Sequence, residues 1–188
     1  DGLESFNRVI EEHPQSPYRK KSLLKRGLIL YRQNSYDAAV ASFKRVVEDY
    51  GVDAESNEAI ATLKNIYIDL GKVDEYGKWL ADIPDYNVSP SELDSLTYQS
   101  AEAVLSSGDC DAATPSFEDY LQKYPKGLFV VPANYYIAEC AYRANNYAVA
   151  LKSYEKVLDK PVSEFTESAL LSAATIRYDQ GDYADALN

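Results

Sequence analysis

The sequence predicts an all-α fold, a solenoid of about five stacked antiparallel helix pairs. The first observation is a repeat of about 37 residues, visible in the equivalent positions Ala39, Tyr76, Ala113, Ala150 and Ala186. The second is the spacing of apolar residues by three and four within each segment, which is helical. The third is a short polar or glycine-containing turn inside every repeat. Stacked units of this kind bury their faces on one another and leave an extended surface open to partners.

The helices follow one another in a regular order. Residues 1–13 are predicted to be the second helix of a preceding repeat. The first full repeat, 17–53, has one helix from Lys20 to Arg32 and another that starts near Tyr36. Because the chain begins within a repeat and ends where a helix starts, we expect a fragment of a longer chain. The remaining units are three full repeats and one incomplete repeat of a single continuous solenoid over 1–188, at 54–90, 91–127, 128–163 and 164–188.

The repeat at 54–90 departs from the pattern. Tyr76 occupies the position of the small residue at which paired helices cross, and the connection through 83–90 is longer than the others. We interpret Trp79 as a core residue of a tolerated irregular repeat. The alternative is a functional kink or a partner site that presents Trp79 or Tyr86.

Three residues of the third and fourth repeats need comment. Pro115 predicts that the helix after Cys110 starts late or is kinked. Cys110 and Cys140 are too few and too far apart for a CxxC motif, and we interpret them as small buried hydrophobic residues. A disulfide would require the start of one repeat's second helix to meet the middle of the next repeat's first helix. The sequence does not establish that contact, so the redox compartment stays open.

Composition argues against several classes of function. Thirty acidic and nineteen basic residues give a net charge of -11, which repels a phosphate backbone, so nucleic acid is not expected as a partner. No run approaches the ~18 apolar residues of a spanning helix, so no direct membrane insertion is expected. His13 is the only histidine, which argues against a His-based triad or a multi-histidine metal site. We expect no cofactor, no metal and no catalytic activity.

The consensus positions point to a family. In the repeat at 17–53 they hold Gly27, Tyr31, Tyr36, Ala39, Phe43 and Val46. This pattern resembles the tetratricopeptide repeat family, whose unit is a helix-turn-helix with small residues where its helices cross. The resemblance implies a right-handed superhelix, about five repeats and a non-enzymatic role in protein–protein interaction. The segment from His13 to Tyr18 is similar to bacterial cell-envelope members, which implies an envelope location, with the cytoplasm as the alternative.

In this family the first helix of each pair lines the concave surface, and equivalent positions of these helices form columns. The candidate partner-binding residues in three such columns are Tyr31, Tyr142 and Tyr178, then Tyr98 and Tyr135, then Glu102 and Glu139. An acidic groove lined by tyrosines favours a protein or peptide segment that carries Lys or Arg beside apolar side chains. The other interpretation is a solvated acidic face whose tyrosines pack between helices.

Two further functions stay open. One is a glycan-binding or small-ligand-binding envelope protein in which the groove tyrosines stack on sugars. The other is an enzyme that uses Glu102 and Glu139 as paired carboxylates, at the upper end of the ~6.5–9.5 Å separation of inverting glycosidases. The sequence names neither the partner nor the oligomeric state.

Overall fold

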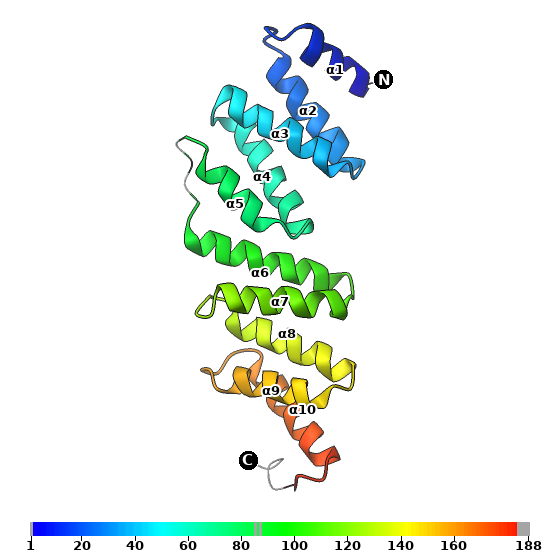
Figure 1. Cartoon of the computed structure of the whole chain (residues 1–188), viewed down its shortest axis with the longest axis vertical. Coiled ribbons are helices and arrows are strands. Elements are labelled where there is room, and N and C mark those ends of the chain that lie inside the picture. The colour runs from blue at the N-terminus through cyan, green and yellow to red at the C-terminus, as the bar shows by residue number, and fades with distance from the viewer. Residues whose placement is uncertain (1, 85, 87, 184–188) are drawn as a thin grey trace. The chain divides into compact units, whose positions relative to one another are not determined.

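The computed structural model describes residues 2–84, 86 and 88–183. Residues 1, 85, 87 and 184–188 lie outside the described part, and with them the second helix predicted for the last repeat. The described residues form ten α-helices and no strand (Figure 1). The predicted all-α architecture of helix pairs is therefore confirmed.

The chain divides into two compact units, residues 1–89 and 90–188. The division falls at the end of the long connection at 83–90. This connection contains Pro84 and ends at Pro90, the first residue of a helix. Proline disfavours helical backbone in the residue before it and is well suited to the first helical position, so the sequence places a break here.

The first unit contains α1 (Gly2–Glu12), α2 (Arg19–Arg32), α3 (Tyr36–Tyr50), α4 (Ala54–Asp69) and α5 (Val73–Ala81). Each helix contacts the next one along the chain.

Helices α2 and α3 cross at Gly27. A Cβ atom at this position would lie 2.6 Å from Cε1 of Phe43, whose side chain is completely buried. The missing side chain of glycine is therefore what lets the two helices approach, as the family consensus implies.

The turns inside the helix pairs share one conformational feature. Each contains a residue with left-handed backbone, which glycine and asparagine adopt at least cost: Asn34, Gly71, Gly108, Asn145 and Gly181. The two asparagines also accept hydrogen bonds from the tyrosine that begins the next helix. The hydroxyl of Tyr36 lies 3.2 Å from Asn34 Oδ1, and that of Tyr147 lies 2.9 Å from Asn145 Oδ1. The five turns predicted from the sequence are confirmed.

Side chains of α3 pack against the irregular pair α4–α5. Trp79 is only 9% exposed, and its Nε1 donates a hydrogen bond to Glu48 Oε1 at 2.8 Å. The ammonium group of Lys44 lies 5.3 Å from the centre of the Trp79 ring. Tyr76, in place of the usual small residue, is buried. The interpretation of Trp79 as a core residue is confirmed.

The second unit contains α6 (Pro90–Ser106), α7 (Cys110–Lys123), α8 (Val130–Arg143), α9 (Tyr147–Leu158) and α10 (Thr166–Asp179). Successive helices lie side by side, as Figure 1 shows for α6, α7 and α8.

Helix α7 begins at Cys110 and continues through Pro115, so the prediction of a late start was wrong. The side chain of Asp109 caps the helix by accepting a hydrogen bond from the backbone N of Ala112 at 2.9 Å. Ala113 is completely buried in the first turn. The cap and this burial fix the start of the helix upstream of the proline.

The connection from α7 to α8 is held by a buried polar cluster. The hydroxyl of Tyr120 donates to Asp94 Oδ1 at 2.6 Å and accepts a hydrogen bond from the backbone N of Phe129 at 2.9 Å. The second oxygen of Asp94 accepts from the backbone N of Leu128 at 2.9 Å. Phe129 is thereby positioned to pack on α6.

Cys110 and Cys140 form a disulfide, with their Cα atoms 5.4 Å apart. Their interpretation as two unpaired hydrophobic residues was therefore wrong. The cause is the packing of α7 against α8, which brings the first residue of one helix within bonding distance of the second half of the other.

Candidate functional site

The predicted site residues of the second unit lie on its three first helices. Helix α6 carries Tyr98 and Glu102, α8 carries Tyr135, Glu139 and Tyr142, and α10 carries Tyr178. The described structure places these residues in three different environments.

On α6, Tyr98 belongs to the core. Its side chain is 4% exposed, and its ring stacks on Phe129 with 4.4 Å between ring centres. Its hydroxyl donates a hydrogen bond to Glu102 Oε1 at 2.9 Å. Burial, reinforced by this bond, raises the pKa of Tyr98 far above its ordinary value. The Tyr98 ring is therefore not open to a partner, whereas Glu102 on the same helix is half-buried.

On α8, Tyr135 and Glu139 are half-buried and one helical turn apart. The Tyr135 ring packs on Phe165, 5.0 Å between centres, which ties α8 to the start of α10. Burial raises the pKa of Tyr135, and the charge of Glu139 adds to the effect. Glu139 Oε1 also accepts a hydrogen bond from the Tyr154 hydroxyl of α9 at 2.6 Å. This carboxylate is thus fixed in place by a neighbouring helix.

Tyr142 and Tyr178 occupy equivalent places at the ends of α8 and α10. Each packs against the first tyrosine of the following segment: Tyr142 lies 5.8 Å from Tyr147, and Tyr178 lies 5.2 Å from Tyr183, between ring centres. Tyr142 is half-buried, but Tyr178 is 63% exposed. Among the predicted tyrosines of this unit, Tyr178 therefore presents the largest accessible fraction.

The selection of tyrosines from the sequence missed two residues. Leu171, at the place on α10 equivalent to Tyr135, is 69% exposed. Its place in the same repeat column as Tyr98 and Tyr135 is the sequence signal that indicates it. Tyr136 was also missed; its ring lies 5.6 Å from that of Phe117 on α7 and 6.1 Å from that of Phe165, between ring centres. Burial, and then the charges of Glu102 and Glu164, raise its pKa.

Tyr31 lies in the first unit and is described with that unit alone. It is half-buried, with its ring 6.0 Å from that of Tyr36. Burial and the charge of Asp69 on α4 raise its pKa. Its surroundings repeat the arrangement of Tyr142 with Tyr147.

The two carboxylates predicted for the site are both hydrogen-bonded. Glu102 and Glu139 each engage a tyrosine hydroxyl through Oε1, and a carboxylate can accept further hydrogen bonds at its second oxygen. Within the described residues, no group of three His, Cys, Asp or Glu side chains is arranged to hold a metal ion. In the same part of the chain, no helix has the length and apolar character needed to cross a membrane.

Comparison with protein families gives two matches, both described as tetratricopeptide repeat. They cover residues 21–51 and 98–163, slightly more than half of the chain. The chain belongs to the tetratricopeptide repeat family. Its TPR units therefore include the α2–α3 pair of the first unit and most of α6 to α9 in the second.

Solved structures include proteins with a similar fold. The apo form of RapI has a TM-score of 0.51 and 13% identity, with 98% of this chain and 55% of that chain covered. MamA has a TM-score of 0.44 and 17% identity, with 86% of this chain and 88% of that chain covered. YrrB, described as a TPR protein with an unusual peptide-binding site, has a TM-score of 0.44 and 15% identity, with 98% of this chain and 88% of that chain covered. A sequence comparison with curated proteins finds no match.

Proposed function

We propose that this TPR chain is a non-catalytic protein-interaction scaffold, and that its second unit binds a partner segment on one face of its first helices. TPR repeats in general serve as scaffolds that bind proteins or peptides. We name the proposed surface the tyrosine face and define it by Glu102, Tyr135, Glu139, Tyr142, Leu171 and Tyr178.

The fixed positions of Glu102 and Glu139 beside tyrosine hydroxyls carry this proposal, and α10 extends the face with Leu171 and Tyr178. Helix α10 buries Ala169, Ala173 and Ile176 almost completely, so it is packed firmly against its neighbours. The same helix leaves Leu171 69% and Tyr178 63% exposed. Covering a large apolar side chain contributes about 1.5–3 kcal/mol, which a partner would recover on binding. Tyrosine adds a large ring at low entropic cost and a hydroxyl for orientation.

The charges of the tyrosine face indicate the chemistry of the partner. Glu102 and Glu139 are half-buried and held by tyrosine hydroxyls, so they are placed without the partner's help. A Lys or Arg side chain would pair with these carboxylates and lie against a tyrosine ring. The net charge of -11 attracts such a partner from a distance. We therefore propose a segment in which basic residues alternate with apolar ones.

The test uses two leucines that are adjacent on α10. Leu171→Ser changes the tyrosine face, whereas Leu170→Ser changes a 52% exposed residue about 100° away around the helix. Both variants are titrated by fluorescence anisotropy with synthetic peptides in which Leu and Tyr alternate with either Lys or Glu. We expect the Lys peptides to bind more tightly, and Leu171→Ser to weaken them about tenfold while Leu170→Ser leaves them within about twofold.

Equal losses of peptide affinity in the two variants would show that the tyrosine face is not the binding surface. Absence of binding by every peptide would contradict peptide recognition by this face, and equal binding of the Lys and Glu peptides would contradict the role of the two carboxylates. If oligosaccharides bound instead and Tyr178→Ser abolished that binding, the protein would be a glycan receptor.

A further inference from the structure

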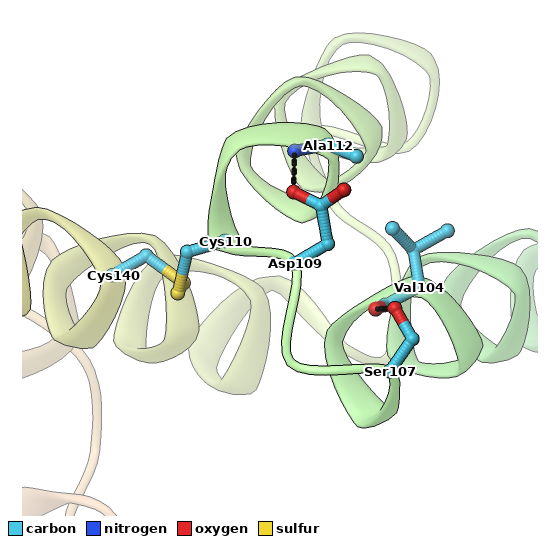
Figure 2. The surroundings of a disulfide bond; sticks show 6 residues. All are labelled: Val104, Ser107, Asp109, Cys110, Ala112 and Cys140. Atoms are coloured by element: carbon cyan, nitrogen blue, oxygen red, sulfur yellow. Dashed lines mark hydrogen bonds between the residues drawn. A yellow bond between two sulfur atoms is a disulfide. The ribbon is translucent and has the colours of Figure 1, made fainter.

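The disulfide joins two helix pairs of the second unit. Cys110 is the first residue of α7, and Cys140 lies in the second half of α8, next to Glu139 (Figure 2). The bond therefore links the second helix of one TPR unit to the first helix of the next unit.

Cys110 directly follows a turn whose backbone is held by hydrogen bonds. The Ser107 hydroxyl donates to the carbonyl oxygen of Val104 at 2.7 Å, and Gly108 takes a left-handed conformation at φ 85°. The Asp109 side chain then caps α7 through Ala112, as Figure 2 shows. These interactions fix the backbone on the α7 side of the disulfide without any contribution from the sulfur atoms.

The equivalent position is filled differently in other helix pairs. It holds Tyr36, Tyr147 and Tyr183, each of which packs on a tyrosine at the end of the preceding helix. In the third pair these two positions hold Cys110 and Leu105. A covalent link to the next unit thus occupies the place where three of the other pairs use an aromatic contact within the unit, whereas the second pair has Ile68 and Val73 there.

The two cysteines differ in their access to solvent. Cys140 is 4% exposed and packed in α8, whereas Cys110, at the helix start, is only half-buried. A thiol can react with an external disulfide only if the attacking sulfur reaches it. Access therefore favours Cys110 as the first thiol to react and Cys140 as the second.

We propose that Cys110 and Cys140 are an oxidative modification site, at which a disulfide-bearing oxidant is captured by Cys110 and displaced by Cys140. In the first exchange the Cys110 thiolate attacks the oxidant, forms a mixed disulfide and releases one thiol. In the second, the Cys140 thiolate attacks Cys110 Sγ, forms the observed bond and releases the second thiol. Overall, two protein thiols lose two electrons and two protons, and the oxidant's disulfide becomes two thiols.

The proposal favours an oxidising compartment for this protein, because disulfides generally form and persist there. It is independent of any partner. Its consequence for the fold is local: the bond holds α8, the helix that carries Tyr135 and Glu139, against the start of α7.

The test follows the reaction of the reduced full chain with oxidised glutathione under native conditions, using acid quenching and intact mass spectrometry. Wild type should end with an internal disulfide and no retained glutathione. Cys140→Ser should accumulate one glutathione adduct, because the resolving thiol is missing. Cys110→Ser, with only the buried thiol, should react at least about tenfold more slowly. In denaturant the two variants should react at similar rates, which shows that the native difference comes from burial.

Peptide mapping of wild type at early times gives a second measurement that needs no variant to fold. The transient adduct should be found on Cys110. An adduct found mainly on Cys140, equal native rates for the two variants, or a wild type that retains glutathione without closing the internal bond would each overturn the proposal.

Discussion

Contacts of single residues set how closely the helices of a pair approach. Gly27 lies against the ring of Phe43, and Asn34 accepts the hydroxyl of Tyr36 in a left-handed turn. Residues at equivalent positions of the repeat also differ in how deeply they are buried. Tyr98 and Tyr135 occupy corresponding positions on α6 and α8, and each packs on a phenylalanine before the next first helix. Phe129 stacks on Tyr98, which is buried, whereas Phe165 lies tilted against Tyr135, which is half-buried. The connection before α8, which carries Phe129, is fixed by hydrogen bonds from its backbone to Asp94 and Tyr120.

Gly27→Ala should lower the free energy of unfolding by about 1–3 kcal/mol, because the new methyl group would have to displace the buried Phe43 ring. Chemical denaturation monitored by circular dichroism measures the change. Gly2→Ala is the matched control, since nothing lies within 4 Å of a Cβ atom there. A Gly27→Ala protein as stable as wild type would show that the crossing of α2 and α3 is looser than the structure indicates.

At the scale of helices, the ends are held by capping and by ion pairs between neighbours. Asp53 precedes α4 and accepts a hydrogen bond from the backbone N of Ser56 at 3.0 Å. The same carboxylate pairs with Lys20 on α2. The hydrogen bond from Lys20, and then that from Ser56, lowers the pKa of Asp53 to about 2. One side chain thus links the start of α4 to an earlier helix.

The lowered pKa of Asp53 predicts an acid-sensitive helix start. A carboxyl group whose pKa is lower in the folded chain than in the unfolded chain stabilises the fold above its unfolded pKa. This contribution should decline from about pH 4 and be lost as the pH falls through about 2. Protection of the first amides of α4 against hydrogen exchange, relative to their intrinsic exchange rate at each pH, should decrease over this range in wild type. Asp53→Asn, which keeps a cap but not the charge, should remove this decrease; an unchanged pH profile in this variant would contradict the assignment.

At the scale of the whole molecule, the chain consists of two compact units, and the disulfide lies in the second. Stability in repeat proteins is approximately a sum of the stabilities of the units and of the contacts between neighbouring units. A covalent link between α7 and α8 should therefore act on its own unit and have little influence on α2 and α3.

Reduction of the disulfide should lower the stability of the second unit by about 2–4 kcal/mol, because the unfolded chain regains conformational freedom. Hydrogen exchange measured by mass spectrometry on the full chain, with and without a reductant, reports each unit separately. We expect faster exchange in α7 and α8 and unchanged exchange in α2 and α3. The double variant Cys110→Ser/Cys140→Ser should behave like the reduced protein and should not respond to reductant. A uniform change across both units would show that they unfold as one.

The sequence by itself determined the helices, the five turns and the small residue at which α2 and α3 cross. These features depend on periodicity and backbone preference, which neighbouring residues set locally. Tertiary structure decided that Tyr98 is buried and that Cys110 meets Cys140. Each of these outcomes depends on contacts between segments far apart in the chain. A repeat pattern assigns equivalent positions, but the burial of each position depends on the particular side chains and connections that surround it.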